Sequence, residues 1–425
     1  MNWVLTLFPI ALLFLGFPIF IILLATVSVA GLLFMNVPMT LVPQIMFGSL
    51  DKFTLLAVPL FIFAGEIMSA GGISKRIIAC IQSIFGHLRG GVALSTVVTC
   101  EFFGAVSGSS PATVAAVGRL MYPALLKAGH SEKFSLGLIT SSGAIASVMP
   151  PSITMIVYGA SAEQSIAALF AGGVVPALLI GLIVAVYILW VARKGNIRSQ
   201  KRASLATIGR ATLDATWALG TPLVILGGIY LGIFSPTEAS GVAGVYGIFV
   251  ALVIYREIGV TEMFRITTNA VYLSSQILII VAASGSFAWL LTVSGVPQYL
   301  VQVVGDIATH QWAVLLIINV FLLIVGCFID PISAVIVLTP LLLPLLKATG
   351  VDLIHFGILM TVNLSIGMFT PPFGLNIFVS QSLFGAKVST LYRGLVPFII
   401  LQIIALLIIT YVPSLTLIPA STVSP

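Results

Sequence analysis

Long runs of apolar residues without charge are the feature that most limits how this chain can fold. They recur along the whole sequence, for example at residues 10–33, 169–191, 313–328 and 398–412. A helix needs roughly 20 apolar residues to cross the hydrocarbon core of a bilayer. Only 7% of the 425 residues are charged, and the mean hydropathy is +1.20. The sequence therefore predicts an all-α polytopic membrane protein in contact with lipid, with about ten to twelve membrane segments.

The N-terminal segment, the cysteines and the histidines indicate no separate chemistry. Residues 3–35 lack a positively charged start and a small-residue cleavage site, so we expect no removable signal peptide. Three cysteines lie in or beside apolar segments and predict neither a disulfide framework nor a metal cluster: Cys80, Cys100 and Cys327. Four histidines lie in loop-like contexts without metal-ligand spacing, so no transition-metal site is expected: His87, His130, His310 and His355.

The basic residues predict the orientation of the chain. The net charge of +6 is spread over short loops and forms no single patch, so nucleic acid is not an expected partner. The densest basic cluster, residues 193–202, is expected in the cytoplasm by the positive-inside rule. The same side is expected for four further stretches or residues: 74–76, 86–91, Arg256 and Arg265. Residues 234–239 carry only Glu238 and are expected to face outward.

One pattern occurs twice, at residues 107–153 and 328–374. Three landmarks of the first copy return in the second at one constant offset: Pro123 at Pro344, Gly129 at Gly350 and Pro150 at Pro371. Pro111 returns at Pro331, one position earlier than this offset, which indicates a gap of a single residue. Such internal repeats are typical of membrane transporters.

Each copy predicts a hairpin that turns at a proline-containing tip, followed by a span that a double proline interrupts. Proline ends a helix, and the freed backbone groups are tolerated at membrane depth only inside protein or beside a cavity. The serines, glycines and carbonyl groups of residues 107–111 are therefore expected to bind something near the bilayer midplane. Residues 326–331 and 365–372 supply the mirrored set, so two re-entrant hairpins that face each other make one site.

Each of these features could also arise without a ligand. Glycine and serine in a membrane segment often mediate close helix packing, and only the repetition favours a binding site. Asp330, at the second tip, is an ion ligand, the cap of a half-helix or a buried acid. Glu66 and Glu101 have no counterpart in the other copy and are left outside the site.

The sequence closely resembles the large membrane subunit of tripartite ATP-independent periplasmic (TRAP) transporters, the DctM-like permeases. The similarity covers nearly the whole chain and includes these motifs: VPLFIFAGEIM from Val58, GHLRGGVALSTV from Gly86, FFGAVSGSSPATVAAVG from Phe102, MPPSITMIVYG from Met149, SPTEAS from Ser235 and TPPFGLNIFV from Thr370. Glu101 departs from the family pattern, in which an aliphatic or small residue usually precedes the two phenylalanines.

The resemblance implies a sodium-coupled uptake permease of the bacterial inner membrane, in which a transport domain moves like an elevator against a scaffold. Its expected substrate is a carboxylate-bearing solute such as a C4-dicarboxylate, sialic acid or a similar sugar acid. Its expected partners are a small four-helix membrane subunit and a periplasmic substrate-binding protein, and at least two sodium ions (Na⁺) are expected to move with the solute.

The resemblance also implies the site residues. One sodium site is expected at Ser107, Gly108, Ser109, Ser110, Ala146 and Met149, and another at Gly326, Asp330, Gly367 and Thr370. The acidic group of the substrate is expected between the tips, beside Ser109, Pro111, Ser147, Pro150, Pro331 and Pro371.

The predicted organisation alternates scaffold and transport segments. Residues 1–90 are expected to form N-terminal scaffold and arm segments, 91–165 the first transport repeat, 166–265 scaffold helices, 266–310 second arm segments, 311–385 the second transport repeat and 386–425 a C-terminal scaffold helix.

Other functions remain as alternatives. A solute channel would need a continuous polar pore, and a sodium-coupled carboxylate symporter could work without a binding protein. An intramembrane serine hydrolase could use Ser107 or Ser109, but no histidine lies in a comparable break to act as base. The chain contains no GxxxxGK[ST] motif, so ATP hydrolysis is not expected. The predicted protein is therefore a transporter and not an enzyme.

Overall fold

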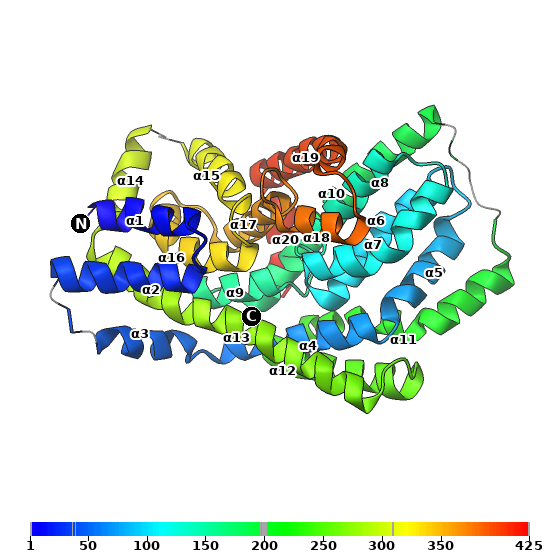
Figure 1. Ribbon diagram of the computed structural model, residues 1–425, viewed down its shortest axis with the longest axis horizontal. Coiled ribbons are helices and arrows are strands. Elements are labelled where there is room, and N and C mark those ends of the chain that lie inside the picture. The colour runs from blue at the N-terminus through cyan, green and yellow to red at the C-terminus, as the bar shows by residue number, and fades with distance from the viewer. Residues whose placement is uncertain are drawn as a thin grey trace.

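The computed structural model describes residues 2–35, 37–38, 40–195, 197, 202–307 and 310–423. Within these residues the regular structure is helical and contains no β-strand, which confirms the predicted all-α class. Figure 1 shows an elongated molecule with the N-terminus at one end and the C-terminus near the middle.

The helices before the first repeat are α1 (Asn2–Phe14), α2 (Ile19–Ala30), the π-helix η1 (Gly31–Met35), α3 (Leu41–Leu50), the 3₁₀-helix η2 (Phe53–Leu56), α4 (Ala57–Ala70) and α5 (Ile73–Phe85). The first repeat contains α6 (Gly91–Ser107), α7 (Ser110–Lys127), α8 (Glu132–Ile145) and α9 (Ile153–Ala162), and α10 (Ile166–Lys194) follows it.

The helices between the repeats are α11 (Leu205–Tyr230), α12 (Pro236–Ile248), the π-helix η3 (Phe249–Ile254), α13 (Val260–Val293) and α14 (Val296–Ile307). The second repeat contains α15 (Gln311–Gly326), α16 (Pro331–Ala348), α17 (Leu353–Gly367) and α18 (Leu375–Phe384), and α19 (Val388–Tyr411) and α20 (Ser414–Ser421) follow it.

Seven helical segments of the described chain are long and apolar enough to cross a membrane alone: η2 with α4, α10, α11, α12 with η3, α13, α16 and α19. Eight shorter apolar helices of 10–17 residues accompany them in the same part of the chain. The 14-residue α8 covers only about 21 Å, less than the roughly 30 Å of a hydrocarbon core. The 15-residue α17 is similarly short. α8 could therefore cross the membrane only together with the short helix α9 that follows it, and α17 only together with α18.

The two repeats have the same element order. The start of α7 at Ser110 and the start of α16 at Pro331 are separated by the constant offset of the sequence repeat, and so are the starts of α8 and α17. Pro111 is the second residue of α7, whereas Pro331 is the first residue of α16. The spacing of this proline pair is one residue shorter because the proline lies one position earlier in the first turn of α16 than in that of α7. The one-residue gap that the sequence indicated is therefore not needed to align these two helices. The peptide bond between the paired prolines is cis in both copies.

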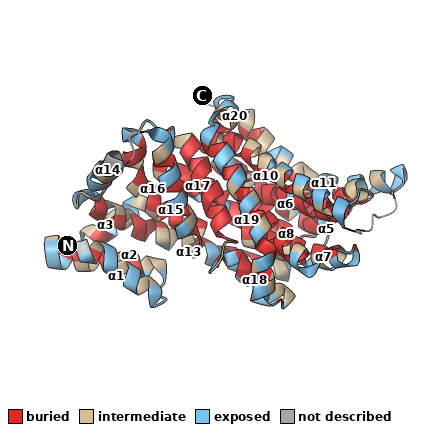
Figure 2. Cartoon of the chain, turned by 90° about the horizontal axis from the view of Figure 1, so that it is seen from above, coloured by how far each residue is buried: buried red, intermediate tan, exposed pale blue. Residues whose placement is uncertain are grey.

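The repeats interlock instead of standing side by side. α16 of the second repeat packs against α9 of the first, and α18 packs against α7. Figure 2 shows the most continuous burial on central helices, among them α6, α8 and α17. In α17 every residue from His355 to Gly367 is buried, so this helix is surrounded by protein on all sides.

Longer helices border this interlocked centre. α13 has 34 residues, runs diagonally along the molecule in Figure 1, and packs against α2, α3, α4 and α16. α12 packs against α4, and α11 against α5. The division into scaffold and transport segments remains a prediction, since packing alone does not show which part moves.

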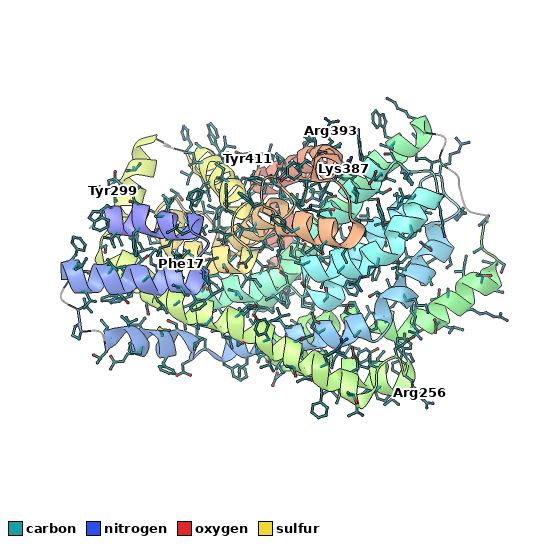
Figure 3. The ribbon with its side chains drawn as sticks, viewed as in Figure 1. Phe17, Arg256, Tyr299, Lys387, Arg393 and Tyr411 are labelled. Atoms are coloured by element: carbon teal, nitrogen blue, oxygen red, sulfur yellow. The ribbon has the colours of Figure 1, made fainter. Side chains whose placement is uncertain are left out.

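One cluster of charges ties the start of α5 to the connection before α13. Arg76 lies 3.0 Å from Glu257 and 3.4 Å from Asp214, and its guanidinium lies 3.8 Å from the centre of the Tyr255 ring. This contact places residues 74–76 and the neighbourhood of Arg256 on one side, as the charge pattern predicts. Figure 3 shows Arg256 on the opposite margin from Lys387 and Arg393. Residues 196 and 198–201 of the basic cluster lie outside the described residues.

One polar residue differs from its predicted surroundings, and a second, Glu101, is nearly buried. His355, expected in a loop-like context, is buried within α17, where its Nδ1 lies 2.7 Å from Thr416 Oγ1. Asp352, three residues before His355, is the N-cap of α17 and accepts a hydrogen bond from the His355 amide. His355 therefore lies in the first turn of the helix and not in the loop before it. Glu101 is 8% exposed in α6 and packs against Gly181 of α10, without an ion pair in the described residues.

Candidate functional site

The first tip is a two-residue break between α6 and α7. α6 ends at Ser107, Gly108 is left-handed with φ +59°, and Ser109 is extended before α7 begins at Ser110. Thr113 Oγ1 donates to the Ser109 carbonyl oxygen at 2.8 Å, and the Ser109 amide donates to Ser107 Oγ at 3.3 Å. In the described structure the Ser109 hydroxyl has no hydrogen-bond partner, so it is available to a ligand.

This tip lies directly against the break between α8 and α9. A Cβ atom at Gly108 would lie 2.8 Å from the Pro151 carbonyl oxygen, and one at Gly104 would lie 2.5 Å from the Cα atom of Ala146. Neither separation leaves room for a side chain. Ala146 is fully buried and Met149 is half-buried. The backbones of tip and break are therefore in contact.

The second tip starts its helix with a charged cap. α15 ends at Gly326, and Asp330 is the N-cap of α16, where its Oδ1 accepts from the Ser333 amide at 3.0 Å. Such a cap satisfies a free amide, and its negative charge is favourable at a helix N-terminus. Asp330 therefore supports the tip, while its other carboxylate oxygen makes no hydrogen bond to the described residues.

The backbones of the second tip and the second break are in contact at two glycines, Gly326 and Gly367. A Cβ atom at Gly367 would lie 2.4 Å from the carbonyl carbon of Gly326. Gly367 occupies the position of the second repeat that Ala146 occupies in the first, so this crossing corresponds to the Gly104–Ala146 crossing. Shortly after it, Thr370 Oγ1 donates to the Ile366 carbonyl oxygen at 2.7 Å. Both repeats thus bring a tip and a break into backbone contact.

Hydrogen bonds connect the two repeats near the breaks. The buried hydroxyls of Ser147 and Ser365 lie 2.7 Å apart. Asn376, in α18, donates from Nδ2 to Ser110 Oγ at 2.7 Å and to the Thr140 carbonyl oxygen at 3.2 Å. Its Oδ1 is buried without a partner in the described chain. Tips and breaks therefore form one connected polar centre.

A cavity of about 170 Å³ lies at the first tip. Both repeats and two bordering helices line it, with Ser107, Ser109, Ile153, Ile332, Glu66 of α4 and Gln276 of α13. A cavity of about 420 Å³ lies at the second tip, where Asp330 and Met368 meet Leu13 and Phe14 of α1. Each tip therefore borders space that a ligand could enter.

The structure brings together each predicted sodium set but not the whole predicted substrate set. Ser109 lines the smaller cavity. Ser147 and Pro150 are buried, and Ser147 is bonded to Ser365. Three further predicted substrate residues line none of the cavities described above, with Pro331 buried and Pro111 and Pro371 half-buried.

Sequence reasoning missed three polar residues at the centre, namely Asn376, Glu66 and Gln276. Asn376 lies six residues after Thr370, in an apolar segment. A single amide side chain in such a segment could have indicated a place in the site. Glu66, which the sequence left outside the site, and Gln276 lie far from both repeats in the chain. Only helix packing brings them to the first tip.

Comparison with known proteins establishes the family. Residues 6–415 match the family described as "Tripartite ATP-independent periplasmic transporter, DctM component". The chain belongs to the DctM family. As a DctM-family protein it is the large permease subunit of a TRAP secondary transporter, a multi-pass membrane protein and not an enzyme.

Three curated relatives are similar over most of this DctM-family chain. The C4-dicarboxylate TRAP transporter large permease protein DctM of Pseudomonas aeruginosa is 39% identical over 88% of this chain and 87% of that protein. The ectoine TRAP transporter large permease protein TeaC of Halomonas elongata is 38% identical over 96% of both. The isethionate TRAP transporter permease protein DctMQ of Oleidesulfovibrio alaskensis is 42% identical over 92% of this chain, which spans only 61% of that protein.

The crystal structure of the YdaH transporter of Alcanivorax borkumensis has a similar fold. It matches with a TM-score of 0.66 over 96% of this chain and 98% of YdaH, at 14% sequence identity. At this identity the similarity supports the fold of the DctM-family permease and nothing further.

Proposed function

We propose that this permease couples sodium entry to the uptake of a solute with an acidic group, by moving its two tips and breaks as one unit past the bordering helices. The observation that carries the proposal is the pair of backbone crossings, Gly104 with Ala146 and Gly326 with Gly367. Helices broken inside protein present carbonyl oxygens and amides that no lipid-facing helix offers, and these bind small ions.

Each crossing is a candidate sodium site. Sodium is a hard cation, and the tips and breaks offer the hydroxyl, carbonyl and carboxylate oxygens that hard cations prefer. The first site uses Ser107, Gly108, Ser109, Ser110, Ala146 and Met149, and the second uses Gly326, Asp330, Gly367 and Thr370. At least two sodium ions therefore move with each solute.

The acidic group of the solute binds between the sodium sites. The N-terminus of α7 has no side-chain cap and carries a partial positive charge, which suits an anionic group, whereas the N-terminus of α16 is capped by Asp330. The free hydroxyl of Ser109 faces the cavity at this place. The relatives are named for C4-dicarboxylates, ectoine and isethionate, small solutes with a carboxylate or sulfonate group. Sialic acid and other sugar acids belong to the same chemical class.

The permease works in the bacterial inner membrane with two partners, a small four-helix membrane subunit and a periplasmic substrate-binding protein. Membership of a tripartite family supports this arrangement. The alternative, a sodium-coupled symporter without a binding protein, predicts uptake by the membrane subunits alone.

Removal of the Ser109 hydroxyl tests the site. We expect Ser109→Ala to insert and fold normally, because this hydroxyl bonds to no other described residue. Loss of one bond to a charged group is expected to weaken sodium-driven uptake by about tenfold. The control is Ser275→Ala, which removes an exposed hydroxyl that bonds only to its own helix at Tyr272. Equal uptake by the two variants would reject Ser109 as a ligand.

A further inference from the structure

A passage leads from the first tip toward the basic side of the molecule. A cavity of about 490 Å³ shares two residues with the 170 Å³ cavity at the tip, Glu66 of α4 and Ala112 of α7. The larger cavity is also lined by Lys75 of α5 and Arg119 of α7. Lys75 precedes Arg76, which lies on the side that the positive-inside rule assigns to the cytoplasm. The passage is therefore a route between the tip and the cytoplasm.

Three charged side chains in this passage, the half-buried Glu66 and the exposed Lys75 and Arg119, have no partner in the described residues. Glu66, Lys75 and Arg119 take part in no ion pair and no side-chain hydrogen bond there. Arg76, by contrast, has two carboxylate neighbours at 3.0 and 3.4 Å. An unpaired guanidinium is well suited to a carboxylate or sulfonate, because its planar fork can donate two parallel hydrogen bonds.

Arg119 lies on a stripe of α7 that faces the passage. Ala112, Ala115, Ala116 and Arg119 all line the larger cavity, and this spacing of three and four positions places them on one helix face. Ala112 lies with Glu66 where the two cavities meet, and Arg119 lies about 10.5 Å further along the axis of α7. The methyl groups between them form a smooth face along which α7 can slide past α4.

We infer that Arg119 is a second binding residue for the acidic group of the solute, on the cytoplasmic side of the tips, and that Glu66 replaces the solute when the hairpin moves outward. In the present arrangement Arg119 stands about two turns beyond Glu66, open to a solute that leaves the first tip. An outward shift of α7 by about 10 Å brings Arg119 to the level that Ala112 now occupies, beside Glu66.

The change of partner gives the passage two states. With the hairpin inward, Arg119 is free for the solute. With the hairpin outward, the Glu66–Arg119 pair closes the passage, and the half-buried Glu66 gains an opposite charge in place of solvent. This inference rests on the elevator movement of the proposed function, so its test must separate the two.

Crosslinking tests the change of partner directly. We replace Cys80, Cys100 and Cys327 by alanine and introduce the pairs Glu66→Cys with Ala112→Cys and Glu66→Cys with Arg119→Cys, for crosslinking with mercuric ion in proteoliposomes. Both pairs are expected to crosslink, and each crosslink is expected to stop uptake. A Glu66–Ala112 crosslink that stops uptake, with no crosslink at Arg119 under any sodium or solute condition, would overturn the inference alone. Continued uptake through the Glu66–Ala112 crosslink would reject the elevator movement itself.

Exchange kinetics test the binding role without crosslinks. Arg119→Gln is expected to raise the KM for internal solute in solute exchange by about tenfold, and by more than it raises the KM for external solute, which changes only through the lost Glu66–Arg119 pair. Arg119→Lys keeps the charge but not the fork, so its internal KM should fall between those of the wild type and Arg119→Gln. The matched control is Lys127→Gln, which removes an exposed charge from the last turn of the same helix. An internal KM equal in Arg119→Gln and Lys127→Gln would overturn the inference.

Discussion

At the residue scale, glycine decides how closely two broken helices can approach. At the Gly326–Gly367 crossing a Cβ atom at Gly367 would lie 2.4 Å from the Gly326 carbonyl carbon, and one at Gly326 would lie 3.2 Å from the Gly367 Cα atom. In the first repeat Ala146 takes the place of Gly367, and Gly104 supplies the missing space. This close approach brings the carbonyl groups of both backbones to one place, as the proposed sodium sites require.

The variant Gly367→Ala tests this close approach. Its methyl group would overlap the backbone of Gly326, so we expect a destabilisation of about 1–3 kcal/mol and a loss of sodium-driven uptake. The control is Gly241→Ala in α12, where a Cβ atom meets nothing within 4 Å and alanine favours the helix. Thermal unfolding in detergent and uptake should separate the two variants, and equal behaviour would contradict the crossing as a constrained site.

His130 makes stability depend on pH. It lies in the turn between α7 and α8, stacks on Phe134 at 4.8 Å, and has a buried Nε2 without a partner in the described residues. Burial lowers its pKa from 6.5 to about 4. Between these values the unfolded state binds more protons, so the free energy of unfolding falls as pH falls from about 6.5 toward 4. The corresponding residue of the second repeat is the buried Val351.

The variant His130→Val should therefore remove this dependence. Between pH 7 and pH 5 the free energy of unfolding of the wild type should fall by on the order of 1 kcal/mol more than that of the variant, and above pH 7 the two should show the same dependence on pH. Chemical denaturation at a series of pH values measures it. If the free energy of unfolding of His130→Val falls between pH 7 and pH 5 as steeply as that of the wild type, His130 is not the group responsible.

At the element scale, the two tips show which features are local and which are not. Prolines and small residues predicted both hairpins and both breaks, because proline ends a helix whatever surrounds it. The capping role of Asp330 was one of the predicted alternatives. The bond from Asn376 to Ser110 was not predictable, since these residues lie 266 positions apart and meet only through the packing of α18 on α7.

Two variants of Asp330 separate its capping role from ion binding. Asparagine can still accept from the Ser333 amide, so Asp330→Asn should keep the stability of the wild type but raise the sodium concentration for half-maximal uptake by about tenfold. Asp330→Ala should also lose about 1 kcal/mol of stability. If Asp330→Asn leaves the sodium dependence unchanged, Asp330 is a cap only.

At the scale of the whole molecule, the sequence predicted the class of protein better than its arrangement. Hydropathy and the constant offset between the two copies predicted a polytopic helical protein with two related halves, because both signals are written along the chain. The interlocking of α16 with α9 and of α18 with α7 depends on surfaces that no single segment reveals. The buried surroundings of His355 were mispredicted for the same reason, since a helix covered on all sides has no polar face to mark it.

The proposed coupling to sodium also has a consequence for the whole molecule. If two sodium ions accompany a monoanion, each cycle moves one net positive charge inward, worth about 2.3 kcal/mol across 100 mV. An inside-negative potential of that size should therefore raise accumulation by about 50-fold. Uptake into proteoliposomes with a potassium diffusion potential measures this, and uptake that does not respond to the potential would exclude net charge movement.

The most direct test of the account is uptake of radiolabelled carboxylates and sulfonates into proteoliposomes that contain this chain and its small subunit. The cognate binding protein is added outside, a sodium gradient is imposed, and each component is omitted in turn. We predict accumulation above the external concentration only when both the gradient and the binding protein are present. Equilibration of solute without either would contradict the account and identify a channel.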